Sequence, residues 1–154
     1  MIPDIDVRVR FCETDAAGHV NNVSYYIYME EARIRFFEFA ELYRYQEEVD
    51  PDMSFIVAST HCNYHRQAYA RQHLRIGTRL TRIGTKSVTL EHDITDANTG
   101  DRIASGGAVV VLFNRRLQRS MEIPGPLRSA LERYLSVSVS GGGHEAECRT
   151  GCTS

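Results

Sequence analysis

The sequence predicts one α+β domain, with an antiparallel five-stranded sheet wrapped around one long central helix. Two observations predict this class: a long amphipathic helical pattern near the N-terminus, and four runs rich in β-branched residues that follow it. At 154 residues, the chain is long enough to bury a substantial core. We expect a folded domain at residues 1–136 and a flexible tail, rich in Ser and Gly, at residues 137–154.

The first element that we expect is a short strand with one buried face. Ile5, Val7, Val9 and Phe11 alternate with residues that would face solvent, and this period of two is typical of a strand. A polar segment follows and leads into the helical pattern.

The helix is predicted over residues 23–45. Apolar side chains recur there at spacings of three, four and seven residues, which places them on one face. Asn21 or Asn22 can cap this helix, because an Asn side chain accepts a hydrogen bond from a free first-turn N–H.

Four strands and a closing helix complete the predicted domain, at residues 55–68, 73–83, 86–95, 102–114 and 124–135. The last of these strands is apolar on both faces, so both faces need cover. A single helix-on-sheet domain covers only one of them. We therefore expect a homodimer or homotetramer.

Charge and hydropathy exclude several classes of function. A net charge of −2 gives no electrostatic case for nucleic acid. No apolar run approaches the roughly 20 residues that span a bilayer, and the N-terminus lacks the features of a signal peptide. We expect a cytoplasmic protein with no membrane span.

Cysteine and histidine spacing predicts no metal site. Cys12 and Cys62 are expected to be small buried side chains, and the other two cysteines lie in the tail without a histidine pair. His61 and His65 share a strand face but lie roughly 13 Å apart by strand rise, too far for one ion.

The segment from Glu13 to Tyr25 is the candidate active site. The start of a helix offers unpaired N–H groups and the positive end of the helix dipole, which suit a developing negative charge. Asp15 precedes that start by a few residues, and this is the layout that hydrolytic chemistry needs. The alternative interpretation is that Asp15, Gly18 and Asn22 only build a turn and a cap.

Within and after this segment stands the run Thr14-Asp15-Ala16-Ala17-Gly18-His19-Val20-Asn21-Asn22, followed by Tyr25, Glu30, Glu31, Ala32 and Arg33. This pattern resembles the signature of hot-dog-fold acyl-CoA thioesterases of the 4-hydroxybenzoyl-CoA thioesterase type. The resemblance extends more loosely to about Pro124.

The resemblance implies a hot-dog fold whose dimers join their sheets edge to edge. It also implies that Asp15 is the catalytic carboxylate, which attacks the thioester carbonyl or activates water. His19 would orient the substrate or assist proton transfer, unless it is a loop histidine bonded to backbone. The catalytic candidates are Asp15, His19 and Asn22, and the substrate-binding candidates are Asn21, Val23, Tyr25, Glu31, Tyr64, His65 and Arg66.

The predicted function is hydrolysis of an acyl-CoA thioester to free acid and CoA, without metal or redox cofactor. Acyl carrier protein is an alternative carrier, because it presents the same pantetheine arm. A non-catalytic hot-dog module that binds acyl-CoA is the alternative from another class. A dehydratase ranks last, since the sequence lacks a paired Asp/His hydratase signature.

Overall fold

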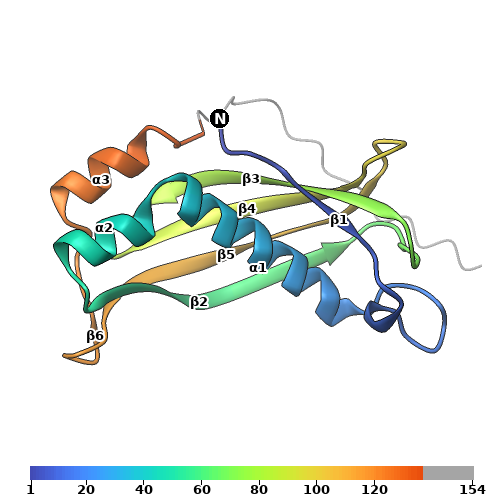
Figure 1. The fold of residues 1–154 in the computed structure, drawn as a ribbon, viewed down its shortest axis with the longest axis horizontal. Helices are drawn as coiled ribbons and strands as arrows, with labels where there is room; N and C mark the ends of the chain where they lie inside the picture. The colour runs from blue at the N-terminus through green and yellow to red at the C-terminus, as the bar shows by residue number, and fades with distance from the viewer. Residues whose placement is uncertain (137–154) are drawn as a thin grey trace, which may run out of the picture.

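The computed structural model describes residues 1–136, and in it an antiparallel sheet curls around the helix α1 (Figure 1). The sheet order is β1-β3-β4-β5-β2, and β6 pairs with β5. The α+β class and the sheet wrapped around a long helix are confirmed. The elements are β1 Ile5–Arg8, the 3-10 turn η1 Phe11–Glu13, α1 Asn22–Phe39, α2 Leu42–Val49, β2 Met53–Tyr64, β3 His73–Ile83, β4 Ser87–Asp96, β5 Arg102–Asn114, β6 Arg119–Ser120 and α3 Gly125–Glu132.

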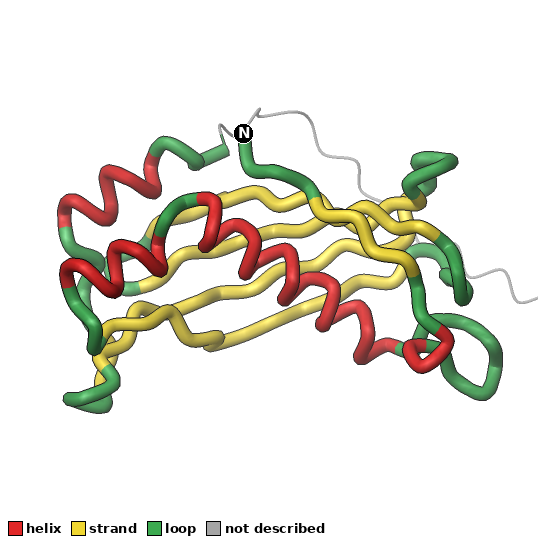
Figure 2. Tube along the Cα trace, in the orientation of Figure 1, coloured by secondary structure: helices red, strands yellow, loops and turns green. Residues whose placement is uncertain are grey.

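The core lies between α1 and the face of the sheet that the helix crosses (Figure 2). Along β4, every second side chain is buried, as expected for a strand with one covered face. Tyr28 and Phe36 of α1 are almost fully buried against this face. None of the helices among residues 1–136 is long and apolar enough to span a membrane.

The single helix predicted over residues 23–45 is two helices, so that prediction is wrong in its extent. The first ends at Phe39 and the second begins at Leu42. Glu41 between them has a φ of 56°, in the left-handed region. The break turns Leu42 into the core, where it is buried. Apolar residues continue at helical spacing across the break, so the sequence pattern gives no sign of it.

Two further predictions near the N-terminus are wrong. The first strand ends at Arg8, and Phe11 lies in the 3-10 turn with its side chain exposed. Cys12 in the same turn is exposed rather than buried, while Cys62 is half-buried. Val9 still bonds to the main chain of Arg71 and Gln72, and the chain then turns at η1, where the Glu13 side chain accepts a hydrogen bond from the Arg10 main chain.

The later strands agree better with the sequence. Those predicted at residues 73–83 and 102–114 have these bounds in the structure. The strand predicted over residues 55–68 spans Met53–Tyr64. The tail predicted at residues 137–154, with Cys148 and Cys152, lies outside the described residues.

One polar pair is buried in the core between β3 and β4. The hydroxyl of Thr78 and Nδ1 of His92 lie 3.0 Å apart. Burial, assisted by the charge of Arg33, lowers the pKa of His92 to about 4, so its ring is neutral at pH 7. Its Nε2 is buried and has no partner within the described chain.

The absence of a side chain at Gly106 lets α1 approach β5 closely. A Cβ placed on Gly106 would lie 2.8 Å from the sulfur of Met29 and would also meet the main-chain oxygen of His61. Such contacts are far below normal van der Waals separation. The Met29 side chain can move, whereas the main-chain oxygen of His61 is held in the sheet and resists a shift.

We expect Gly106→Ala to lower the free energy of unfolding by about 1–3 kcal/mol, the range for an overpacked core. Urea unfolding followed by circular dichroism measures it. Gly125→Ala is the matched control, because a Cβ there meets nothing within 4 Å. An unchanged midpoint for Gly106→Ala would contradict the close approach.

Candidate active site at the start of α1

Glu13 ties both ends of the loop before α1 together, through its buried carboxylate at one end and its main-chain oxygen at the other. Its oxygens accept hydrogen bonds from the main-chain N–H of Arg10 at 2.8 Å and from the Arg10 guanidinium at 3.0 Å. The main-chain oxygen of Glu13 accepts from the N–H of Asn21 at 3.0 Å and from the hydroxyl of Ser24 at 3.3 Å. Burial raises the pKa of Glu13, but the Arg10 hydrogen bonds outweigh it and lower the pKa overall.

The loop itself is closed by main-chain hydrogen bonds. Thr14 and Val20 form an antiparallel bridge, and the N–H of Asp15 donates to the His19 oxygen at 2.9 Å. Gly18 has a φ of 87°, a conformation that glycine adopts without steric cost. Its N–H donates to the Asp15 oxygen at 2.9 Å. The loop is therefore a tight hairpin that presents Asp15 on one side.

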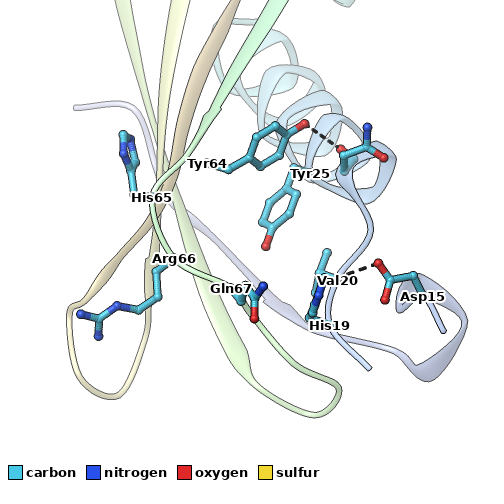
Figure 3. Close-up of a pocket in the computed structure, with 9 residues that line it drawn as sticks. Asp15, His19, Val20, Tyr25, Tyr64, His65, Arg66 and Gln67 are labelled. Atoms are coloured by element: carbon cyan, nitrogen blue, oxygen red, sulfur yellow. Dashed lines mark hydrogen bonds and ion pairs between the residues drawn. The ribbon is translucent and has the colours of Figure 1, made fainter. Parts of the chain in front are cut away.

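The Asp15 carboxylate is fixed at one oxygen and half-exposed. Its Oδ1 accepts from the N–H of Ala17 at 2.8 Å. Its Oδ2 lies 3.6 Å from Nδ1 of His19, and Figure 3 shows the two side chains turned toward each other. His19 can thus orient the free carboxylate oxygen or share a proton with it.

Asn21 is the N-cap of α1. Its side-chain oxygen accepts from the N–H of Ser24 at 2.9 Å and lies 3.0 Å from the Ser24 hydroxyl. The N–H groups of Asn22 and Val23 belong to the first turn, where a helix supplies no acceptor of its own. These two N–H groups can therefore donate hydrogen bonds to an oxyanion bound at the helix start.

A cavity of about 480 Å³ opens between this helix start and the end of β2. Asp15 forms one of its walls, and Asn22 of α1 forms another. The residues that line it are Asp15, His19, Val20, Asn22, Tyr25, Tyr64, His65, Arg66 and Gln67.

Two tyrosines form the aromatic part of this cavity. The rings of Tyr25 and Tyr64 meet edge to face, with centroids 5.3 Å apart. The Tyr64 hydroxyl donates to the main-chain oxygen of Asn22 at 3.2 Å, which ties β2 to the helix start. Burial raises the pKa of Tyr25 and, with the neighbouring Cys62, raises the pKa of Tyr64 to about 12. Both phenols are neutral at pH 7.

The polar residues after β2 are held by other partners. Nε2 of His65 lies 2.9 Å from the Ser105 hydroxyl, and Arg66 pairs with Asp101 at 2.7 Å. Figure 3 shows His65 and Arg66 directed away from Asp15. They line the rim of the cavity rather than its reacting end.

The structure brings seven of the ten predicted site residues to this cavity, all from one chain. Asn21 and Val23 adjoin it through the helix start, whereas Glu31 is exposed on α1 and does not line it. Val20 and Gln67 also line the cavity, although neither was among the candidates. Val20 belongs to the motif that carries the resemblance, and Gln67 ends the segment 63–67, which the same resemblance implies borders the pocket. Within residues 1–136, no three His, Cys, Asp or Glu side chains gather to hold a metal ion.

Comparison with known families identifies the chain's relatives. Residues 9–131 match the model of the thioesterase-like superfamily. The chain belongs to this superfamily. The match includes the Asp15 loop, α1 and the whole of the sheet beyond β1.

Two curated relatives are similar over most of their length. YsmA of Bacillus subtilis is 37% identical over 109 residues, which cover 71% of each chain. The long-chain acyl-CoA thioesterase FadM of Escherichia coli is 28% identical over 129 residues, which cover 84% of this chain and 96% of FadM.

Solved structures show the same fold. The probable thioesterase YbaW of Escherichia coli superposes with a TM-score of 0.77 at 27% identity, over 86% of this chain and 98% of that one. The gentisyl-coenzyme A thioesterase BH1999 gives a TM-score of 0.72 at 30% identity, over 83% and 98%. The fold is thus the hot-dog fold of these thioesterases.

The cap of α1 yields a stability prediction. Asn21→Ala removes the acceptor of the Ser24 N–H, and we expect a loss of about 1 kcal/mol in the free energy of unfolding. Asn22→Ala is the matched control, because this neighbouring Asn does not cap; its change should stay within about 0.5 kcal/mol. Equal losses in thermal or urea unfolding would contradict the capping role.

Proposed function

We propose that this protein is an acyl-CoA thioesterase, which converts an acyl-CoA and water into a free acid and CoA. The observation that carries the proposal is that one cavity is lined both by the Asp15 carboxylate and by the first residue of α1. The Asp15 carboxylate, which can act as base or nucleophile, and the N–H groups at the helix start, which can stabilise an oxyanion, thus lie at the same cavity. Thioester hydrolysis needs little more, because a thiolate leaves readily.

The reaction begins with the thioester carbonyl oxygen directed at the N–H groups of Asn22 and Val23. Asp15 either takes a proton from water, whose oxygen then attacks the carbonyl carbon, or attacks that carbon itself. The oxyanion that forms accepts hydrogen bonds from the helix start. It then collapses, the C–S bond breaks and CoA leaves as the thiolate. By the second route, water hydrolyses the resulting anhydride and restores Asp15.

The relatives support CoA as the carrier. FadM and BH1999 are both named for acyl-CoA substrates, and this chain covers nearly all of each of them. The capped helix start and the Asp15 loop need only the thioester and its pantetheine arm, which acyl carrier protein shares. Hydrolysis of acyl carrier protein thioesters alone would therefore reassign the carrier and keep the chemistry.

Asp15→Asn should lower kcat for an acyl-CoA by about a hundredfold to ten-thousandfold, the usual range for a lost general base. The amide has nearly the same shape as the carboxylate but neither takes the proton nor attacks. Release of CoA thiol from aromatic, medium-chain and long-chain acyl-CoAs measures the change.

The control is Asp6→Asn, which neutralises an exposed carboxylate outside the cavity and should leave kcat unchanged. Acyl-CoA binding to Asp15→Asn, measured by calorimetry, should stay near the wild-type value. Full turnover by Asp15→Asn would overturn the assignment of this residue. Absence of turnover in the wild type, with binding intact, would favour a non-catalytic acyl-CoA-binding module.

We also propose that two copies pair through β2 and form a homodimer. β2 is an edge strand, bonded only to β5 within the described chain. Ile56 and Val57 on it are 41% and 46% exposed, although long apolar edges are usually protected. A second copy would pair this edge and cover both side chains.

Light scattering should therefore give twice the chain mass for the wild type. Ile56→Lys places a charge on the proposed interface, and we expect it to shift the protein toward the monomer. Thr81→Lys, on an exposed residue of β3, is the matched control and should remain dimeric. A monomeric wild type at micromolar concentration would contradict the proposal.

A further inference from the structure

A second cavity, of about 300 Å³, lies between α1 and β2. It is formed by the next turns of the same helix and by the middle of the same strand that bound the first cavity. Its lining residues are Tyr26, Met29, Glu30, Arg33, Val57, Thr60 and Gly107.

Arg33 is a buried cation without a close anion. The residue is only 8% exposed, and burial lowers its pKa. Its ion pair with Glu30 is long, at 3.9 Å, and the Glu30 side chain is 59% exposed. The Glu30 carboxylate is therefore mainly solvated and neutralises the charge of Arg33 poorly.

Within residues 1–136, no carboxylate other than that of Glu30 lies within salt-bridge distance of Arg33. His92 lies near enough for the charge of Arg33 to lower its pKa further, and at about 4 that pKa leaves the ring neutral at pH 7. Its Nε2 has no partner within the described chain. A desolvated charge that lacks a well-placed counter-ion is costly. A carboxylate entering the cavity would supply one, in the two-pronged geometry that a guanidinium favours.

The two cavities follow each other along one side of α1. Asn22 and Tyr25 line the first, and Tyr26 and Arg33 line the second. Along β2, Tyr64 lines the first cavity, and Val57 and Thr60 line the second. Eleven residues separate Asn22 from Arg33, about 16 Å along a helix at 1.5 Å per residue.

We propose that Arg33 binds a carboxylate at the far end of an elongated acyl group, so that the substrates are ω-carboxyacyl thioesters. The thioester would lie at the start of α1, and the acyl chain would run beside the helix to the guanidinium. This inference rests on the proposed thioesterase function. A carboxylate of a second copy is the other possible source of the same chemistry, and the test below separates the two.

The test compares an ω-carboxyacyl-CoA with the plain acyl-CoA of equal chain length. The wild type should hydrolyse the ω-carboxy substrate with the higher kcat/KM. Arg33→Met keeps an unbranched apolar stem and should lower kcat/KM for that substrate about tenfold to hundredfold, the effect of losing a charged hydrogen bond. The plain substrate should change little.

Glu30→Gln provides a second variant that does not disturb a buried group. It removes a negative charge from the lining of the cavity, where that charge would repel an entering carboxylate, so the preference for the ω-carboxy substrate should rise several-fold. Glu38→Gln is its matched control, because Glu38 pairs with Arg35 on the exposed side of α1 and lines neither cavity. Its preference should equal that of the wild type.

Binding of the same two thioesters to Asp15→Asn, measured by calorimetry, makes the inference independent of turnover. Tighter binding of the ω-carboxy compound that Arg33→Met abolishes supports it, even where the proposed hydrolysis fails. Equal binding of the two compounds overturns it, even where hydrolysis is observed. A loss of dimer in Arg33→Met with an unchanged preference also overturns it and assigns the carboxylate to the second copy.

Discussion

The candidate site depends on the closure of one loop by Glu13. Its carboxylate is held by Arg10, and its main-chain oxygen holds both Asn21 and Ser24 at the start of α1. The lowered pKa of Glu13 means that the carboxylate is charged at neutral pH in spite of its burial. Together with the main-chain hydrogen bonds inside the loop, Glu13 holds Asp15 near the start of the helix, where the proposed chemistry would need it.

The placement of α1 on the sheet then decides where a ligand can lie. At Gly106 the side chain of Met29 lies against the backbone of β5 and fills the space that a side chain would need. The side of the helix toward β4 is filled by the core, whereas its side toward β2 contains both cavities. Since β2 is the edge of the sheet within the described chain, the same packing places both cavities beside an unpaired strand edge.

The sequence predicted local features well and tertiary ones poorly. Strands β3 and β5 have their predicted bounds because turn residues interrupt a clear pattern at both ends. The break at Glu41 was missed because helical periodicity continues past it and the turn serves only to bury Leu42. Asp15 and Asn22 meet in one cavity as the motif predicted. The second cavity around Arg33 was missed, since it exists only once β2 is packed beside α1.

The N–H groups at the start of α1 and the guanidinium of Arg33 would act on different kinetic constants. In the proposed reaction, the N–H groups at the helix start would meet full negative charge only as the oxyanion forms, so they would stabilise the transition state more than the bound thioester and act on kcat. The guanidinium of Arg33 carries its charge throughout, and a distal carboxylate would meet it equally in both states. Such uniform binding lowers KM and leaves kcat unchanged. Arg33 would therefore select among acyl groups, and Asp15 with the helix start would set how fast any selected thioester is cleaved.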